Sequence, residues 1–404
     1  MNIIVQNFNA EAMNEIEYVV DKIIENHIKN KHVVAVVDTS QKNKTKLIEM
    51  IAPLQMIEGR EADLFYASGV QIEAARVVAL LRKKGYKAIA FTGWQAGIET
   101  NHQFTKAQLV ALKTNHMKDW LKSGTIVVVA ANQGITEELD ISTLGEGGAD
   151  TTAIALAASL RAEKCICFSK NGGLFTAPPM ILNTRKLSFV TYDEFLELGE
   201  TSLIHPRAIE FAKMYEVLVE VRSLYKQTMG TIIGEESHLE KNLLVRSITF
   251  TDNVTKITLE GKKQKQLNVA VVFSILAEVG INVDIIIQNT YEIEHSIVSF
   301  SIDSKDVEKA KQVLIKKKEV LQYNSMEVEN DLAKVSIVGS GMIFYPGVAA
   351  KMFQTLTEKN IAIKMISTSE IKISTVIPRK DMIHAVEVLH ESFELNIEDK
   401  AVEL

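Results

Sequence analysis

Short, nearly continuous apolar runs alternate with helical patterns over the first 240 residues. The runs lie at residues 33–37, 88–91, 125–129 and 164–168. An unbroken apolar run of this length is typical of a central strand that is covered on both faces. The segment 72–84 has the spacing of a helix, and Lys83, Lys84 and Gly85 form a stop signal with cations on its last turn. The pattern predicts an α/β domain with a mostly parallel sheet between helices.

The rest of the chain carries a repeat. The stretches EVGINVDIIIQ (278–288) and EKNIAIKMIST (358–368) are alike at an offset of about 80 residues. In both copies we expect a leading strand, the end of a helix, two more strands and a second helix. Those further elements are expected at 254–259, 296–300 and 307–321 in the first copy, and at 333–338, 371–376 and 381–393 in the second. Each copy therefore spells β-α-β-β-α-β, the ferredoxin-like unit. The predicted domains are 1–240, 250–330 and 331–404.

Composition narrows the class of protein. The 404 residues are 47% hydrophobic and 24% charged, with a formal net charge of −6, which does not favour a nucleic-acid partner. The two cysteines, Cys165 and Cys167, stand two apart in one predicted strand, where a disulfide is geometrically poor, so a reduced, cytoplasmic chain is expected. We expect no signal peptide, and no apolar run approaches the roughly 20 residues of a membrane helix. The histidines show no metal-ligand spacing, so no metal site of the protein's own is expected.

A glycine-rich turn, GEGGAD (145–150), opens the helix that follows the predicted strand 125–129 and its loop. Backbone N–H groups at the start of a helix favour an anion such as phosphate. This turn, however, carries Glu146 and has no Lys or Arg beside it. Asp150 is either a catalytic residue or simply the residue that caps the helix. The backbone pattern thus predicts an anion site that lacks the usual cations.

Five motifs together resemble the aspartate kinase (aspartokinase) family. They are FTGWQAGI (91–98), TLGEGGADTTAIALAASL (143–160), HPRAIEFAK (205–213), VSIVGSGM (335–342) and KMISTSEIKISTV (364–376). The resemblance covers essentially the whole chain and is greatest to the Bacillus-type, lysine-sensitive form. It implies an amino-acid-kinase fold followed by two ferredoxin-like ACT domains, and transfer of the ATP γ-phosphoryl group to the β-carboxylate of aspartate with magnesium. It also implies amino-acid effectors, lysine or threonine, and dimers formed through the ACT domains, with a family paralogue as the alternative partner.

The chain departs from the family pattern where the resemblance implies catalysis. The phosphate-binding Lys corresponds to Asn7, the aspartate-binding Glu to Val70, and the aspartate-binding Arg to Glu146. A second Arg of the family, on the nucleotide side, corresponds to Met180. Phosphoryl transfer depends almost wholly on positioning and positive charge, so these losses predict impaired catalysis. The chain has also acquired acids where the family has none, and they are Glu11, Asp38, Glu99 and Glu146.

Several residues keep the family pattern around the predicted site. The resemblance makes Asp150 the catalytic base or orienting group, and assigns substrate binding to Thr151, Thr152, Trp94 and Arg207. A purely structural role is the alternative for each of them. Trp94 suits a packed corner, and Arg207 follows a proline in the first turn of a helix.

The repeats keep more of the family pattern than the site does. The resemblance places effector contacts in the first repeat at Asn282, Asp284 and Gln288, and in the second at Ser340, Gly341 and Met342. Asp284 suits an ammonium group, and backbone N–H groups at Ser340–Met342 suit a carboxylate. The alternative is that glycines such as Gly341 only permit a turn. The lysine-rich stretch 262–265 suggests a solvated loop.

Three hypotheses follow. The first is an aspartate kinase homologue with impaired or lost catalysis that keeps amino-acid-sensing ACT domains. The second is an active aspartate kinase with an atypical site that still uses ATP and magnesium. The third is a kinase-fold enzyme adapted to another, cationic substrate, for which the acquired acids Glu11, Asp38, Glu99 and Glu146 are the reason. Convergence of these acids within hydrogen-bonding reach in one pocket favours the third hypothesis, and their dispersal on the surface favours the first.

Overall fold

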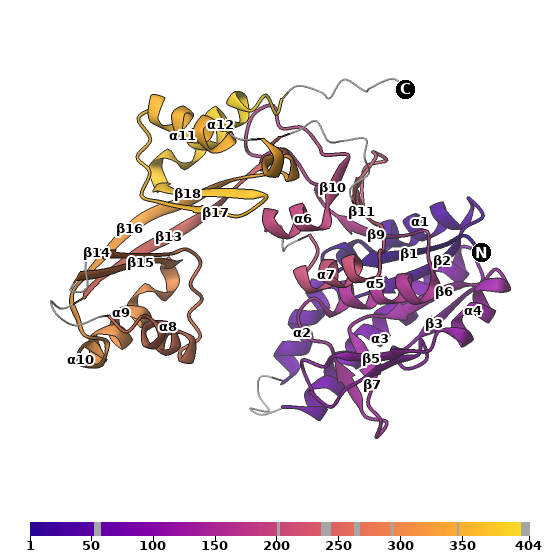
Figure 1. Ribbon diagram of the computed structural model, residues 1–404. Coiled ribbons are helices and arrows are strands. Elements are labelled where there is room, and N and C mark those ends of the chain that lie inside the picture. The colour runs from indigo at the N-terminus through magenta and orange to yellow at the C-terminus, as the bar shows by residue number, and fades with distance from the viewer. Residues whose placement is uncertain are drawn as a thin grey trace. The chain divides into compact units, whose positions relative to one another are not determined.

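The computed structural model describes residues 1–51, 58–199, 203–235, 244–261, 267–291, 295–345 and 347–396. The chain divides into two compact units (Figure 1). The first comprises Met1–Leu174 and Lys186–His238, and the second comprises Phe175–Arg185 and Leu239–Leu404. The lysine-rich stretch at 262–265 and Pro346 lie outside the described residues.

The first unit is built on an eight-stranded sheet in the order β10-β12-β11-β9-β1-β2-β6-β3. Its pairings are parallel except between β11 and β12. The strands are β1 (Ile3–Phe8), β2 (His32–Val37), β3 (Ala88–Phe91), β6 (Ile126–Ala130), β9 (Lys164–Ser169), β10 (Phe189–Thr191), β11 (Val219–Ser223) and β12 (Thr231–Gly234). All residues of β1 and β6 are buried, as expected of strands with cover on both faces.

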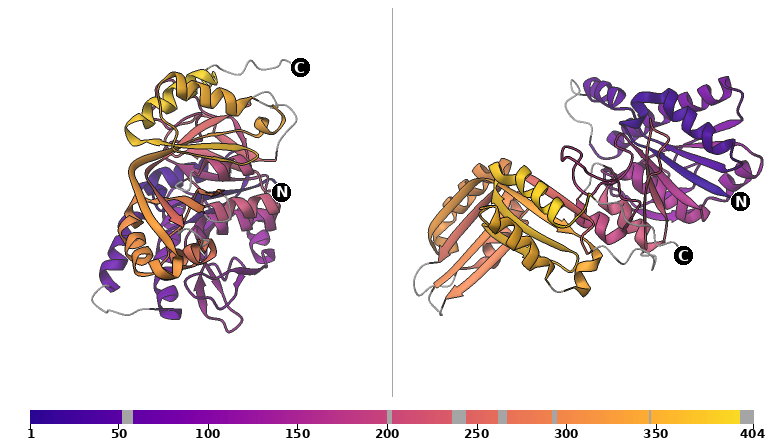
Figure 2. Two further views of the ribbon diagram at one scale, coloured as in Figure 1. Left: turned by 60° about the vertical axis from the view of Figure 1, so that its left-hand side comes forward. Right: turned by 90° about the horizontal axis from the view of Figure 1, so that it is seen from above.

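Helices cover both faces of this sheet, as the two views in Figure 2 show. They are α1 (Ile16–His27), α2 (Gln41–Ile51), α3 (Arg60–Lys83), α4 (Asn115–Lys122), α5 (Gly148–Leu160), α6 (Tyr192–Leu198) and α7 (Pro206–Met214), with a 3-10 turn η1 (Ala12–Glu15). A smaller sheet has the order β5-β4-β7-β8, formed by β4 (Ile98–Thr100), β5 (Leu109–Leu112), β7 (Gln133–Ile135) and β8 (Ile141–Thr143). The predicted three-layer α/β architecture is confirmed.

Helix α3 corrects one expectation from the sequence. By length and composition alone it is apolar enough to cross a membrane, although no such run was expected. It also carries two fully buried acids, Asp63 and Glu73. Both carboxylates accept hydrogen bonds from neighbouring segments of the same unit, Asp63 from Thr143 and Glu73 from Ser40. These contacts are those of a helix packed in the core of a folded domain.

The second unit contains one six-stranded sheet in the order β14-β15-β13-β16-β18-β17. Its strands are β13 (Ser247–Gly261), β14 (Ile286–Tyr291), β15 (His295–Asp303), β16 (Tyr323–Val338), β17 (Met365–Thr368) and β18 (Lys372–Pro378). Its helices are α8 (Val269–Glu278), α9 (Val307–Lys316), α10 (Lys318–Leu321), α11 (Val348–Glu358) and α12 (Met382–Ser392), with 3-10 turns η3 (Ser304–Asp306), η4 (Ser340–Phe344) and η5 (Arg379–Asp381). Both predicted repeats are therefore present.

The two repeats share their central strands, which the sequence did not predict. Strand β13 pairs with β16 along almost its whole length, and the register shifts near Thr251 and Val254. Residues 254–260 of β13 belong to the first repeat, whereas 247–251 pair with 334–338 in the second. Among the described residues, the fourth strand of the second repeat thus precedes the first repeat instead of following α12. The second repeat therefore includes residues 247–251, which lie outside its predicted range of 331–404.

A segment from the middle of the chain also packs in the second unit. Ala177 and Ile181 are buried in the core of the second repeat, with residues of α11 and α12 such as Met352 and Leu389. Thr176 hydrogen-bonds the buried His390 through Nε2 at 2.9 Å. The chain therefore leaves the first unit after Leu174 and returns at Lys186, inside the range predicted as one domain.

Candidate functional site

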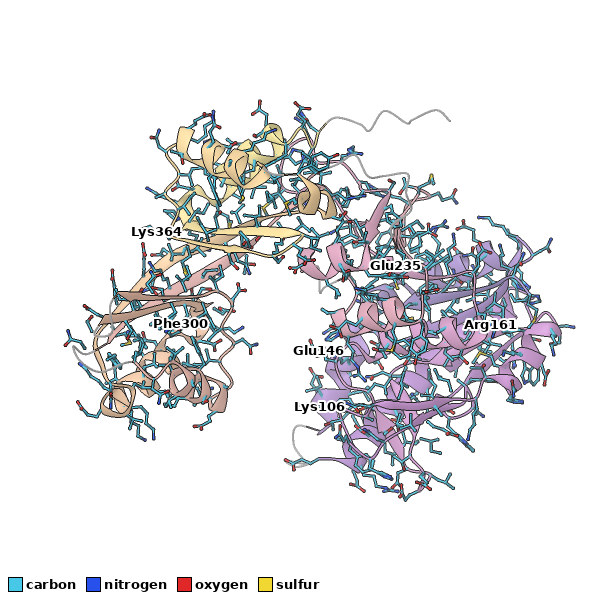
Figure 3. The ribbon with its side chains drawn as sticks, in the orientation of Figure 1. Lys106, Glu146, Arg161, Glu235, Phe300 and Lys364 are labelled. Atoms are coloured by element: carbon cyan, nitrogen blue, oxygen red, sulfur yellow. The ribbon has the colours of Figure 1, made fainter. Side chains whose placement is uncertain are left out.

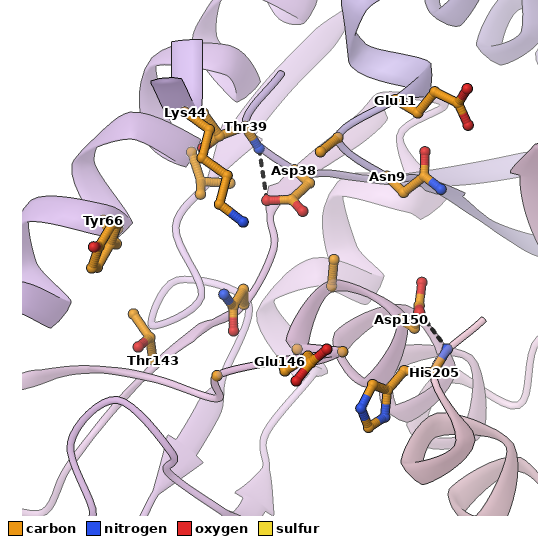
Figure 4. A pocket seen from close by; sticks show the side chains of 18 of the residues that line it. Asn9, Glu11, Asp38, Thr39, Lys44, Tyr66, Thr143, Glu146, Asp150 and His205 are labelled. Atoms are coloured by element: carbon orange, nitrogen blue, oxygen red, sulfur yellow. Dashed lines mark hydrogen bonds between the residues drawn. The ribbon is translucent and has the colours of Figure 1, made fainter. Parts of the chain in front are cut away.

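A cavity of about 710 Å³ lies in the first unit, at the carboxyl ends of β1 and β2 and beside the start of α5 (Figure 4). Ligands of parallel α/β sheets bind at this edge, where loops rather than strands supply the side chains. The lining residues are Asn9, Ala10, Glu11, Asp38, Thr39, Lys44, Leu47, Ile48, Tyr66, Ala67, Val70, Thr105, Asn132, Thr143, Gly145, Glu146, Gly147, Gly148, Ala149, Asp150, Leu203 and His205. The predicted glycine turn thus forms part of the wall of this cavity.

The glycines of the turn are required by close contacts. A Cβ on Gly147, whose φ is +69°, would lie 2.3 Å from Cγ of His205. A Cβ on Gly148 would lie 1.8 Å from Oδ1 of Asn132. The backbone at the start of α5 therefore runs close to its neighbours, and the N–H of Gly148 donates to the carbonyl oxygen of Gly145 at 3.1 Å. The tight turn brings the positive end of α5 to the cavity, which favours an anion there.

Asp150 stands in the first turn of α5 and is held by two neutral donors. The Nδ2 atom of Asn7 donates to its Oδ1 at 2.6 Å, and the backbone N–H of His205 donates to its Oδ2 at 2.8 Å. Burial raises the pKa of Asp150, and the hydrogen bonds from His205 and Asn7 oppose this shift. Oδ1 of Asn7 is buried and has no hydrogen-bond partner among the described residues. Asn7, which the resemblance aligned with a Lys, thus orients Asp150 through an uncharged amide.

Three of the acquired acids line the cavity, and the fourth does not. Glu11, Asp38 and Glu146 belong to its wall together with Asp150. Glu146 lies on the turn before α5 and is exposed (Figure 3). Glu99, by contrast, pairs with Lys113 at 2.6 Å in the smaller sheet. Three of the four acids therefore share one cavity wall, and the fourth lies elsewhere.

The pKa of Asp38 is raised in the cavity wall, where Asp38 is buried near a second carboxylate, Asp150. Burial raises the pKa of Asp38 from 3.8 to about 6, and the charge of Asp150 adds to the rise. A hydrogen bond from the backbone N–H of Thr39, 2.7 Å long, and the charge of Lys44 work in the opposite direction. Lys44 extends from α2 toward Asp38 in Figure 4 and is the one Lys or Arg among the described residues that line the cavity.

The residues predicted to bind substrate lie outside the cavity wall. The hydroxyls of Thr151 and Thr152 donate to backbone oxygens one turn earlier in α5, at 2.9 and 2.7 Å. Trp94 is 60% exposed on the connection between β3 and β4. The guanidinium of Arg207 donates to the carbonyl oxygens of Leu144 and Ala107. The side chains of Thr151, Thr152 and Arg207 therefore bind backbone carbonyl groups of the protein itself, whereas that of Trp94 is exposed.

Sequence reasoning missed several polar residues of the wall, among them Lys44 and Asn132. Lys44 had a signal, because it stands in a lysine-rich helix shortly after strand β2, which ends at Val37. Asn132 had none. Its side chain accepts a hydrogen bond from the backbone N–H of Leu144 at 3.1 Å and so supports the glycine turn from behind.

The predicted effector residues lie in the second unit. Asp284 is exposed and forms an ion pair with Lys334, and Asn282 and Gln288 are exposed as well. Gln288 lies on the edge strand β14. Ser340, Gly341 and Met342 form the 3-10 turn η4, and Met342 packs against the core of the second repeat. An effector ammonium at Asp284 would therefore compete with the ammonium of Lys334.

Comparison with known proteins matches both parts of the chain to families. Residues 9–223 match the amino acid kinase family, and residues 335–393 match an ACT domain. The chain is 43% identical over 409 residues to Aspartokinase 2 of Bacillus subtilis (strain 168), and 45% identical over 409 residues to an aspartokinase of Geobacillus stearothermophilus. Both alignments cover 100% of each chain.

Solved structures share the fold. The crystal structure of E. coli aspartokinase III in complex with lysine and aspartate superposes with a TM-score of 0.80 at 20% identity, covering 97% of this chain and 100% of that one. An aspartate kinase of Clostridium acetobutylicum gives a TM-score of 0.79 at 20% identity, with coverage of 97% and 100%. The full-length identity to the Bacillus and Geobacillus proteins favours the hypothesis of a working kinase over that of lost catalysis.

Proposed function

Because the chain belongs to the aspartokinase family, we propose that it transfers the γ-phosphoryl group of ATP to the side-chain carboxylate of aspartate through an atypical active site. Full-length identity of 43–45% to proteins named aspartokinase supports this proposal. The structural observation that carries it is the position of Asp150. This carboxylate is fixed by two hydrogen bonds at the start of α5 and faces a cavity large enough for substrates.

In the proposed reaction, the chain contributes mainly position and backbone dipoles. The positive end of α5, which begins at Gly148, stabilises the charge that develops on the phosphoryl oxygens. Asp150 orients the reacting groups, and Lys44 is the cation of the wall. No three His, Cys, Asp or Glu side chains of the described residues come together as a metal site. Magnesium, which usually binds through phosphates and one or two carboxylates, would reach this site with the nucleotide.

We expect slow turnover because two positions of the site lack the cations of the family. Asn7 and Glu146 stand where the family has a Lys and an Arg, and removal of one preorganised donor typically costs about 10²–10³ in kcat. Turnover is therefore expected below the usual enzyme range of about 1–10³ per second, yet measurable.

An ADP-release assay with aspartate as the varied substrate, together with hydroxylamine trapping of the acyl phosphate, tests this function. We expect ADP formation that depends on aspartate, and a trapped hydroxamate in equal amount. An Asp150→Asn variant serves as the control, because it keeps the shape of the side chain and removes its charge. ADP formation that is independent of aspartate, or equal in this variant, would rule the proposal out.

A cationic acceptor is the second candidate, and the acids of the cavity favour it. Glu11, Asp38, Glu146 and Asp150 face a space with one Lys in its wall, so an amine is attracted where a second carboxylate is repelled. The same assay with acceptors that carry an amine in place of the side-chain carboxylate distinguishes the two candidates. Faster ADP release with such an amine than with aspartate would support the second candidate and contradict the first.

For the second unit we propose amino-acid sensing. The ACT match and the fold shared with the lysine complex of E. coli aspartokinase III support a regulatory role. We propose lysine or threonine as effector, a homodimer formed by the second units, and a cytoplasmic enzyme. Binding of radiolabelled lysine or threonine to the full chain, measured by equilibrium dialysis, tests the effector. No binding of either up to millimolar concentration would contradict it.

A further inference from the structure

Asp63 and Arg207 form hydrogen bonds with the backbone next to the glycine turn. Asp63 accepts from N–H groups, and Arg207 donates to carbonyl groups. The turn is preceded by Thr143 and Leu144, which lie beside the segment 105–107. The two segments are joined by a hydrogen bond from the N–H of Ala107 to the carbonyl oxygen of Thr143, 2.9 Å long. Neither charged side chain, Asp63 or Arg207, lines the cavity among the described residues.

Asp63 binds the N–H groups of this pair of segments. It stands in the first turn of α3 and its side chain is fully buried. The backbone N–H of Thr105 lies 3.0 and 2.9 Å from its two oxygens, and the N–H of Thr143 donates at 2.7 Å. The hydroxyl of Thr143 donates a further bond at 2.6 Å. A buried carboxylate needs such donors, and these N–H groups need an acceptor.

Arg207 binds the carbonyl groups of the same pair. Its Nη1 donates to the oxygen of Leu144 at 3.1 Å, and its Nη2 donates to the oxygen of Ala107 at 3.4 Å. The fork of the guanidinium thus spans the two segments that Asp63 spans on the N–H side. Asp63 belongs to α3 and Arg207 to α7, two helices that lie far apart in the sequence.

The clamped residues are in direct contact with the site. Thr105 and Thr143 line the cavity together with Gly145 and Glu146. A Cβ on Gly145 would lie 2.6 Å from the carbonyl oxygen of Thr105, so the turn rests on the clamped segment. Thr105 itself has a φ of +67°, a backbone conformation that a β-branched residue adopts only when its surroundings hold it there.

We propose that Asp63 and Arg207 are positioning residues that together set the place of the Gly145–Asp150 turn for phosphoryl transfer. This inference rests on the proposed kinase function. Neither side chain touches the reacting atoms, and both act through the backbone of Thr143 and Leu144. Misplacement of a catalytic group by about 1 Å can cost about 10²-fold in rate, so we expect a large effect from a small displacement.

Hydrogen exchange measured by mass spectrometry tests the clamp independently of activity. The variants are Asp63→Asn, whose amide offers one acceptor oxygen in place of two, and Arg207→Gln, which is too short to span both carbonyls. We expect faster exchange of the peptide that covers 143–150 in both. The matched control is Glu73→Gln, another fully buried acid of α3, which accepts hydrogen bonds from Ser40 at 3.1 Å and from Arg76 at 2.7 Å. In the control, exchange is expected to rise around residue 40 and not at 143–150.

Kinetics provide the second measurement. In both variants kcat for aspartate-dependent ADP formation is expected to fall about 10²-fold, with a KM for ATP within a factor of three of the unmodified protein. Unchanged exchange at 143–150 in Arg207→Gln, or equal acceleration there in Glu73→Gln, would overturn the clamp even if Asp63→Asn failed to fold. Absence of aspartate-dependent activity in the unmodified protein would refute the proposed function instead, and the exchange result would still decide the clamp.

Discussion

Replacing Asn7 by Lys tests whether the lack of a cation beside Asp150 limits the rate of phosphoryl transfer. Asn7 is 2% exposed in β1, between β2 and β9, and its Nδ2 lies 2.6 Å from Oδ1 of Asp150. A Lys at this position places an ammonium where the amide now is, next to a carboxylate whose pKa burial has raised. We expect the pKa of Asp150 to fall and the rate of phosphoryl transfer to rise.

The size of the effect follows from the distances. Two unit charges about 4 Å apart attract with about 4 kcal/mol at an effective dielectric constant of about 20. Packing a longer side chain into a filled core costs about 1–3 kcal/mol. A net gain of about 1–3 kcal/mol in the transition state remains, and about 1.4 kcal/mol corresponds to a tenfold change in rate. Asn7→Lys should therefore raise kcat for aspartate-dependent ADP formation by about 5-fold to about 10²-fold.

The assay is ADP release coupled to NADH oxidation, recorded across pH, with Asn7→Met as the matched control. Met has nearly the length of Lys and no charge, so it reproduces the packing and not the electrostatics. In Asn7→Lys the acidic limb of the kcat/KM profile should also move to lower pH, because the Asp150 carboxylate then ionises more readily. An equal gain in Asn7→Met, or unchanged kcat and pH profile in a folded Asn7→Lys protein, would refute the reasoning.

The remaining predictions concern stability, assembly and effector binding. The native state binds a proton at Asp38 more tightly than the unfolded chain does, since its pKa is raised from 3.8 to about 6. Stability should therefore fall by up to about 3 kcal/mol as pH rises between about 4 and 6, and Asp38→Asn should melt higher than the unmodified protein at pH 8 but not at pH 3.5. Ile286 and Ile366 are 50% and 41% exposed on the two edge strands of the six-stranded sheet, so light scattering should give a dimer that either substitution by Lys weakens. Lysine or threonine at 100 times its Kd should stabilise the chain by about 2.7 kcal/mol, and Asp284→Ala should abolish this thermal shift.

Each of these predictions has a clear contrary result. Equal melting differences for Asp38→Asn at pH 3.5 and pH 8 would contradict the raised pKa of Asp38. A mass of 45 kDa for the unmodified chain at micromolar concentration would contradict the dimer. A full thermal shift in Asp284→Ala would show that the effector binds elsewhere, and no shift with lysine or threonine would contradict both as effectors.

The sequence by itself determined the elements and the backbone of the site. The apolar runs 33–37 and 164–168 predicted β2 and β9, because a strand buried on both faces needs such a run. The glycine turn at 145–150 predicted the start of α5, because helix starts and left-handed turns have local signals. The repeat predicted the α and β elements of the second unit for the same reason, since periodicity is a local property.

Only the tertiary structure decided which distant residues meet. The sequence does not specify the register of β13 against β16, so it did not predict that residues 247–251 pair within the second repeat. It also did not predict that Ala177 and Ile181 pack in the second unit. Likewise, Glu11, Asp38 and Glu146 share a cavity while Glu99 pairs with Lys113 in the smaller sheet, although all four acids are alike in the sequence. Local pattern specifies each strand and helix, but the neighbours of a side chain depend on strand order and register, which arise from packing between segments far apart in the chain.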